Sequence, residues 1–76
     1  MANPAADLIE FIAKAIVTQP DAVSVNEVDD GEMLELVTDD EDRGRVIGRQ
    51  GRVAKAMRAV LGASRHGRDT RLEIVD

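Results

Sequence analysis

The stretch VIGRQGRVAKAMRAVL, residues 46–61, decides the fold, because a glycine-bracketed basic turn leads there into an amphipathic pattern. Gly48 and Gly51 have no Cβ atom, so the chain can turn sharply and come close to a ligand at these positions. Arg49 and Gln50, between the glycines, are then presented outward. We expect a helix to begin directly after Gly51.

The start of this helix is a natural anion site. The first amide groups of a helix have no acceptor within it, and they direct a partial positive charge at whatever lies in front. Three bases, Arg49, Arg52 and Lys55, are grouped around Gly51. A plain helix C-cap, the alternative interpretation of the glycine turn, needs no such bases, whereas they suit a phosphate. The sequence therefore predicts a phosphate-binding turn.

The two faces of this helix are predicted from its period of about 3.6 residues. Arg52, Lys55 and Arg58 fall together on one side and predict a cationic ridge that continues from the turn, with a merely solvated helix face as the alternative for each. The apolar residues of the opposite side recur at the spacing of a buried stripe, and they are Val53, Ala56, Met57, Val60 and Leu61.

Length and composition limit the classes of protein that this chain can form. Its 76 residues suffice for one domain, near the lower size limit for a self-sufficient core. The chain has no cysteine, so we expect neither disulfides nor thiolate metal sites, and a reducing cytoplasm suits it. Its longest apolar stretch, residues 8–17, contains Glu10 and Lys14 and is far shorter than the roughly 20 residues of a membrane span. We expect a cytoplasmic protein without a membrane span.

The net charge of −5 hides a division between the two halves of the chain. Residues 1–42 carry one base, Lys14, against twelve acids, whereas residues 43–76 carry nine bases against three acids. The halves are therefore −11 and +6. Because the local field steers a polyanion more than the net charge does, the basic half can still bind nucleic acid.

Local patterns predict the remaining elements. Asn3 before Pro4 is a helix start signal, and the apolar face that follows includes Leu8, Ile9, Ile12, Ala13, Ile16 and Phe11. Gly62 is the expected C-cap of the long helix. The expected elements are a helix from Pro4 to before Gln19, strands at 23–28 and 33–38 around an Asp29-Asp30-Gly31 turn, a short helix near 41–47, the long helix, and a strand at 70–75.

The order of these elements predicts the topology. A hairpin makes the first two strands antiparallel, and a two-helix crossover makes the second and third parallel. We expect an α+β fold in the order α-β-β-α-α-β, with a three-stranded mixed sheet and three helices on one face.

The acidic run from Asp39 to Asp42 admits two interpretations. One is a metal or general-acid cluster. The other, which we favour, is that Asp39 or Asp40 caps the short helix and the remaining acids lie in its first turn. Gly44 within that helix costs roughly 1 kcal/mol relative to alanine, which suggests a packing reason for the small residue. We expect no metal site and no cofactor.

The run from Val46 to Gly51, followed by an amphipathic helix, resembles the VIGxxG core of the KH domain, a module that binds single-stranded RNA. A helix and a strand before this core and a strand after it resemble the type II arrangement. The likeness covers the whole chain, residues 1–76, as a single KH domain. Gln19-Pro20-Asp21 and the run from Gly44 to Gly48 are similar to the small bacterial KH proteins of the KhpA family.

The resemblance implies a groove between the short helix, glycine turn and long helix on one side and the last strand on the other. It implies that Gly48, Arg49, Gln50 and Gly51 meet phosphates and sugars, with Arg45, Arg52 and Lys55 beside them. Ile47 and Ala54 would form part of an apolar floor for bases, and Arg65, His66 and Arg68 would lie on the variable loop. The family implies no catalytic residue.

The resemblance also implies partners. Proteins similar to KhpA are associated with self-association and with a larger multidomain KH protein, KhpB, also called Jag, in the control of cell elongation and envelope growth. Post-transcriptional regulation or RNA chaperoning is the implied role. The lack of tyrosine and tryptophan predicts weak, loosely selective RNA binding, because aromatic stacking is not available from the basic half.

Three other functions stay open to different degrees. A protein-interaction subunit, with RNA binding secondary, is suggested by the acidic half and by Leu61, Gly62 and Ala63 as the margin of a dimer surface. A helix-turn-helix DNA reader is less favoured, because the flanking strands are out of place. An enzyme is least favoured, since one histidine and no cysteine leave no paired nucleophile and base.

Overall fold

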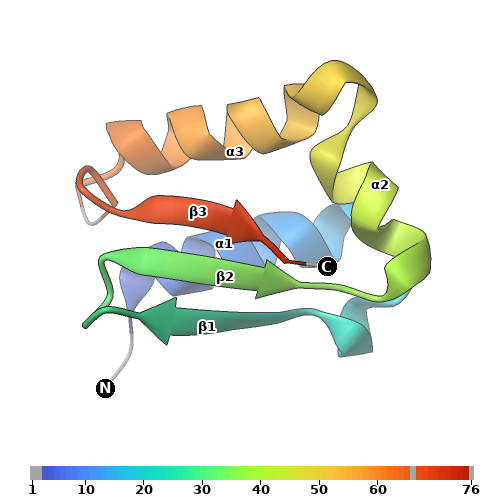
Figure 1. Cartoon of the computed structure of the whole chain (residues 1–76), viewed down its shortest axis with the longest axis horizontal. Helices are drawn as coiled ribbons and strands as arrows, with labels where there is room; N and C mark the ends of the chain where they lie inside the picture. The colour runs from blue at the N-terminus through green and yellow to red at the C-terminus, as the bar shows by residue number, and fades with distance from the viewer. Residues whose placement is uncertain (1–2, 66, 76) are drawn as a thin grey trace.

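The helices and strands follow one another in the expected order α-β-β-α-α-β (Figure 1). The structure is a computed structural model that describes residues 3–65 and 67–75. The helices are α1 (Pro4–Ile16), α2 (Arg43–Ile47) and α3 (Arg52–Ala63), and the strands are β1 (Ser24–Val28), β2 (Met33–Val37) and β3 (Arg71–Ile74). Three short 3-10 turns join them, namely η1 (Pro20–Ala22), η2 (Asp40–Asp42) and η3 (Arg49–Gly51).

The sheet is mixed, as predicted, with the strand order β1-β2-β3. β1 pairs with β2 in antiparallel register, with Asn26 opposite Glu35. β2 pairs with β3 in parallel register, with Leu34 opposite Leu72. The expected turn between β1 and β2 has positive φ angles at Asp29, Asp30 and Gly31, of 54°, 57° and 88°. The α2–α3 crossover makes the parallel pairing possible.

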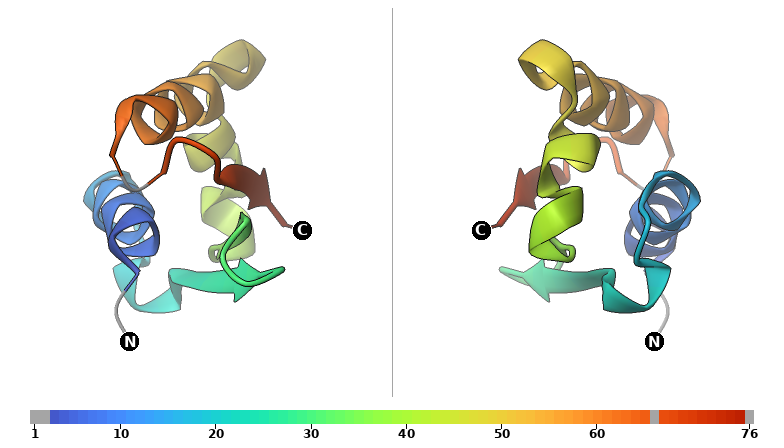
Figure 2. Two further views of the ribbon diagram at one scale, coloured as in Figure 1. Left: turned by 90° about the vertical axis from the view of Figure 1, so that its left-hand side faces the viewer. Right: turned by 90° about the vertical axis from the view of Figure 1, so that its right-hand side faces the viewer.

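Figure 2 looks along the strands and shows α1 and α3 together on the same side of the sheet. Leu34, Leu36 and Leu72 point to that side and are buried. One core fills the space between the layers, and its buried members are Ala5, Ile9, Ala13, Val23, Leu34, Leu36, Val46, Met57, Leu61 and Leu72. The expected α+β fold is therefore confirmed.

α1 begins as its sequence predicts. The Asn3 side chain accepts hydrogen bonds from the amides of Ala5 and Ala6, at 3.0 and 3.2 Å. The apolar face is narrower than expected, because Phe11 is 74% exposed and Ile16 is 37% exposed. Including these two residues in the buried face was wrong.

The buried face of α3 also differs from the prediction. Ala54, Met57 and Leu61 are buried, whereas Ala56 is exposed and Val60 is 45% exposed. The helix is thus rotated so that Ala54 faces the core in place of Ala56 and Val60. A small alanine lets α3 approach its neighbours there, and sequence periodicity does not distinguish one alanine of a helix from another.

Two expectations about glycines were wrong. α3 continues through Gly62 to Ala63, and Ser64 is its C-cap. Gly44 has no neighbour within 4 Å of the place where a Cβ would lie, so packing within the described chain does not require a small residue there. Gly67, by contrast, is buried, and a Cβ there would lie 2.5 Å from Leu61 Cδ1.

Candidate nucleic-acid interface

The glycine turn forms a hinge between α2 and α3, here called the hinge and made of Gly48, Arg49, Gln50 and Gly51. Gly48, Gln50 and Gly51 have φ angles of 78°, 58° and 72°. The Gly51 amide donates to the Gly48 carbonyl at 3.1 Å, which closes the turn. α3 starts at Arg52, directly after Gly51, as predicted. Three positive φ angles in four residues bring Arg49 and Gln50 to the surface, where both are exposed.

The two glycines are needed for different reasons. Gly48 combines a positive φ with a ψ of 169°, a region that only glycine adopts readily, and a Cβ there would lie 2.5 Å from Val53 Cγ2. Gly51 is left-handed as well, but the space where its Cβ would lie is open. Gly48 therefore packs against the protein, whereas Gly51 leaves room for a ligand to approach the backbone.

The start of α3 has the electrostatics of an anion site. The Gly51 and Arg52 amides donate to the Gly48 and Arg49 carbonyls, and no side chain of the described residues caps the amides that follow. Arg49, Arg52 and Lys55 are exposed around it, and within the described part of the chain none of them forms an ion pair. Among the described residues, the Arg52 guanidinium donates only to Gln50 Oε1, at 3.3 Å. These cations are therefore available to a phosphate.

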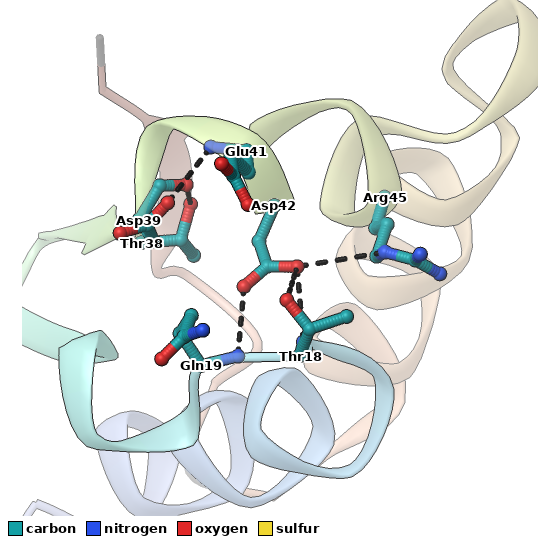
Figure 3. Close-up of polar contacts among 7 residues, drawn as sticks. All are labelled: Thr18, Gln19, Thr38, Asp39, Glu41, Asp42 and Arg45. Atoms are coloured by element: carbon teal, nitrogen blue, oxygen red, sulfur yellow. Dashed lines mark hydrogen bonds and ion pairs between the residues drawn. The ribbon is translucent and has the colours of Figure 1, made fainter.

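Arg45 differs from these cations, because it is paired with a buried acid (Figure 3). Arg45 Nε lies 3.5 Å from Oδ1 of Asp42, whose side chain is fully buried. Asp42 also accepts hydrogen bonds at 2.9 Å from the Thr18 amide, the Thr18 hydroxyl and the Gln19 amide. The backbone hydrogen bond from Thr18 is the main cause that lowers the pKa of Asp42 below its ordinary value.

Asp42 lies in the first turn of η2, as predicted for the acids that follow the cap, but the sequence did not predict that its side chain is buried. Asp39 has the predicted capping role, since its side chain accepts from the Glu41 amide at 3.0 Å. Asp42 turns inward instead. Of the described residues it is the one buried polar or charged residue, and it connects α2 to the segment after α1.

The apolar floor expected beside the hinge is present only in part. Ile47 is 37% exposed at the end of α2, beside Gly48, and offers an apolar surface. Ala54 is 4% exposed and belongs to the buried side of α3. Of these two residues, Ile47 alone can meet a base.

Arg58 lies elsewhere than predicted. Its Nε donates to the Leu72 carbonyl at 3.2 Å, so the side chain reaches over β3 instead of extending the ridge of Arg52 and Lys55. It lines a cleft of about 420 Å³ together with Thr70, Arg71, Leu72 and Glu73. The Leu72 acceptor is 14 residues away in the sequence, so no local pattern indicates this contact.

The variable loop carries mixed charge. Arg65 and Arg68 line a second cleft, of about 240 Å³, with Asp30, Glu32 and Asp69. These carboxylates lower the positive potential that a phosphate would meet there. His66 lies outside the described residues.

Two features are absent from the part of the chain that the structure describes. No helix there combines the length and the apolar character that crossing a membrane requires. No group of three or more histidine, cysteine, aspartate or glutamate side chains there is arranged to hold a metal ion.

Comparison with known families decides the identity of the fold. The sequence model of the KhpA/KhpB KH domain matches residues 6–74. The chain belongs to the KhpA/KhpB KH-domain family. The family resemblance expected from the VIGxxG run is thereby confirmed, and the α-β-β-α-α-β order agrees with it.

Relatives within this family are similar over most of their length. RNA-binding protein KhpA of Halalkalibacterium halodurans is 49% identical over 73 residues, covering 91% of this chain and 96% of the relative. The KhpA proteins of Clostridium perfringens and Treponema pallidum are 50% identical over 60 residues and 45% identical over 74 residues, covering 76% and 92% of this chain and 80% and 92% of the relatives. These relatives are named for RNA binding, and the KhpA/KhpB KH-domain family is not an enzyme family. No solved structure gave a significant match.

Proposed function

We propose that this chain is a cytoplasmic protein that binds single-stranded RNA, with the hinge of Gly48, Arg49, Gln50 and Gly51 on the sugar-phosphate backbone. The observation that carries the proposal is the uncapped start of α3 behind a hinge with three positive φ angles. Membership of a family whose relatives are named RNA-binding proteins supports it. The absence of cysteine suits the reducing cytoplasm.

The residues beside the hinge supply the remaining contacts in this proposal. Arg45, Arg52 and Lys55 bind phosphates, and Ile47 packs against a base. The single aromatic side chain of the chain, Phe11, lies on α1, so stacking contributes nothing at the hinge. Binding therefore depends mainly on charge and is weakly selective for sequence.

The proposal is tested by replacing Arg49 and Gln50 together with aspartate. A fluorescent single-stranded RNA of about ten nucleotides exceeds the roughly four that a KH groove clamps, so the groove can be filled. We expect the affinity, measured by fluorescence anisotropy, to fall about tenfold or more, because two carboxylates then face the phosphates. Unchanged affinity in a folded variant would refute the proposal.

Lys14→Asp and Arg49→Asp form a matched pair for the same assay. Both change the net charge by the same amount, but Lys14 lies on α1 and pairs with Glu10 at 3.6 Å. We expect Lys14→Asp to weaken binding less than about threefold and Arg49→Asp to weaken it more. Equal losses would mean that net charge, and not the hinge, sets the affinity.

The wider role that we propose is post-transcriptional regulation or RNA chaperoning, together with a multidomain KH protein of the KhpB/Jag type, in cell elongation and envelope growth. A family that joins KhpA and KhpB domains supports such a partnership. Pull-down of the chain with crosslinking of its bound transcripts tests both parts. Recovery of neither RNA nor a KH partner would contradict this role.

A second candidate function is that of a protein-interaction subunit, as a homodimer or heterodimer. Phe11 on α1 and Val60 on α3 favour it, because these large apolar side chains are 74% and 45% exposed. Leu61, considered for the dimer margin, is 1% exposed and cannot contact a partner directly. Light scattering at high concentration tests self-association, and Val60→Asp is expected to abolish it. A monomer at every concentration would exclude the homodimer.

A further inference from the structure

The carboxylate of Asp42 is unusual in this chain because it is charged and yet fully buried. Removing a carboxylate from water is costly unless hydrogen bonds and a counter-charge replace the lost hydration. Thr18 and Gln19 supply three hydrogen bonds of 2.9 Å, and Arg45 supplies the counter-charge. The contact with Arg45 also connects this buried carboxylate to a cation that is exposed beside the hinge.

The geometry of that contact leaves most of Arg45 available. Nε faces Asp42 at 3.5 Å, and the rest of the guanidinium points away from the carboxylate (Figure 3). The Arg45 side chain is 59% exposed. Its two terminal amino groups form the planar fork that binds phosphate oxygens in pairs.

The cations at and beside the hinge, Arg49, Arg52 and Lys55, are not paired with a buried acid among the described residues. Arg49 and Lys55 form no ion pair within the described chain, and Arg52 donates only to the exposed Gln50. A long flexible side chain loses rotational freedom when it binds, and a side chain that is already oriented loses less. Among these four cations, Arg45, three residues before Gly48, is the one that pairs with a buried carboxylate.

We propose that Asp42 is a positioning residue for ligand binding, which holds the Arg45 guanidinium as a fixed fork for a phosphate on the α2 side of the hinge. This role depends on the RNA-binding function proposed above. Asp42 itself does not touch the ligand, because its side chain has no exposed surface.

For Asp42→Asn, an orienting role of Asp42 and simple electrostatics predict opposite changes in RNA affinity. Asp42→Asn removes a negative charge near a site for a polyanion, and removal of such a charge by itself tightens binding. If the carboxylate orients Arg45, the same substitution weakens binding. The direction of the change in affinity therefore separates the two explanations.

The experiment measures the affinity for the fluorescent RNA in Asp42→Asn and in its matched control Asp40→Asn, each under conditions where circular dichroism shows a folded protein. Asp40 belongs to the same acidic run, pairs with Arg43 at 2.7 Å and has a side chain that is 90% exposed. We expect Asp42→Asn to weaken binding roughly threefold to tenfold and Asp40→Asn to leave it unchanged or slightly tighter. Tighter binding by Asp42→Asn would overturn the proposal.

A double-variant cycle separates positioning from a general effect on the fold. In an Arg45→Gln background, Asp42→Asn should cause no further loss of affinity, because the fork is already absent. An equal loss in both backgrounds would mean that Asp42 acts through the fold alone, which contradicts the proposal.

Arg45→Lys keeps the test decisive if Asp42→Asn does not fold. Lysine retains the charge but not the planar fork, so we expect a loss of roughly threefold or more, close to that of Arg45→Gln. Full affinity in Arg45→Lys would refute the oriented fork. If the unaltered protein binds no RNA, or if the double variant Arg49→Asp and Gln50→Asp has unchanged RNA affinity, the proposed function is wrong. The positioning role of Asp42 is then wrong as well. Loss at the hinge with no effect at Asp42 rejects this role only.

Discussion

The two ends of α2 differ in how their polar groups are satisfied. At the start, Asp42 is buried and meets three hydrogen-bond donors and Arg45. At the far end, the hinge from Gly48 to Gly51 leads into a helix that no side chain caps. A helix of five residues is not stable by itself. Tertiary contacts at this first end, the closed end, hold α2 in place, whereas at the hinge, the open end, the cations are left for a ligand.

The largest expected effect on stability comes from breaking the closed end. Asp42→Ala leaves the Thr18 and Gln19 donors without their acceptor and removes the partner of Arg45. Of all the variants proposed here, we expect Asp42→Ala to show the largest fall in Tm, measured by thermal circular dichroism. Asp40→Ala, two residues away and exposed, is the control and should leave Tm nearly unchanged. Similar Tm values for the two variants would contradict a structural role for the buried carboxylate.

The next largest effect distinguishes the two glycines of the open end. Gly48→Ala should lower the free energy of unfolding by about 3 kcal/mol or more, because its Cβ would overlap Val53 and its backbone conformation suits only glycine. Gly51→Ala should lower the free energy of unfolding by only about 1 kcal/mol, because its Cβ meets open space and only the positive φ is unfavourable. Chemical denaturation measures both values. Equal losses would show that packing against Val53 is not what requires Gly48.

Gly51→Ala should nevertheless weaken RNA binding more than its small effect on stability suggests, because the added methyl group stands where a ligand would approach the backbone. Anisotropy with the same RNA checks this. An affinity equal to that of the unaltered protein would remove Gly51 from the proposed interface.

A smaller effect is expected on the stability of the protein at acidic pH. The pKa of Asp42 in the folded protein lies below its ordinary value of 3.8, chiefly because of the Thr18 backbone hydrogen bond. Its contribution to stability is therefore complete above that ordinary value and is lost as the pH falls through the lowered pKa of the folded state. Tm measured against pH should show the gap between the unaltered protein and Asp42→Asn narrowing in this acid range. A gap that stays constant into strong acid would contradict the pKa direction.

The smallest effect is on the salt dependence of binding. With two or three phosphates neutralised at the open end, the logarithm of the binding constant should fall against that of salt concentration with a slope of about −1.5 to −2. Arg52→Gln should reduce the steepness by about 0.7, whereas Lys14→Gln on α1 should not change it. A slope that responds equally to both variants would place the phosphate contacts outside the hinge.

Much of the open end could be predicted from the sequence, because its signals are local. Gly48 and Gly51 mark positive φ by residue type, and Asn3 with Pro4 marks the start of α1. The mixed sheet follows from the hairpin and the crossover. The cations of the hinge need no tertiary partner, so their exposure agrees with the simplest expectation.

The closed end could not be predicted, because its partners are distant in the sequence. Thr18 lies 24 residues from Asp42, and nothing in a run of four acids shows which one turns inward. Arg58 poses the same difficulty, since its acceptor on Leu72 is 14 residues away. The rotation of α3 likewise depends on how closely Ala54 approaches the core, which a hydrophobic pattern does not encode.

We propose that RNA binds through its backbone at the open end of α2 and not at the sheet or at α1. The most direct test is an amide NMR titration of the unaltered protein with single-stranded RNA. We expect the largest shifts at Gly48, Gln50, Gly51 and Val53, with small shifts across β1 and the exposed side of α1. Unshifted hinge amides, with large shifts on the sheet or on α1, would contradict it.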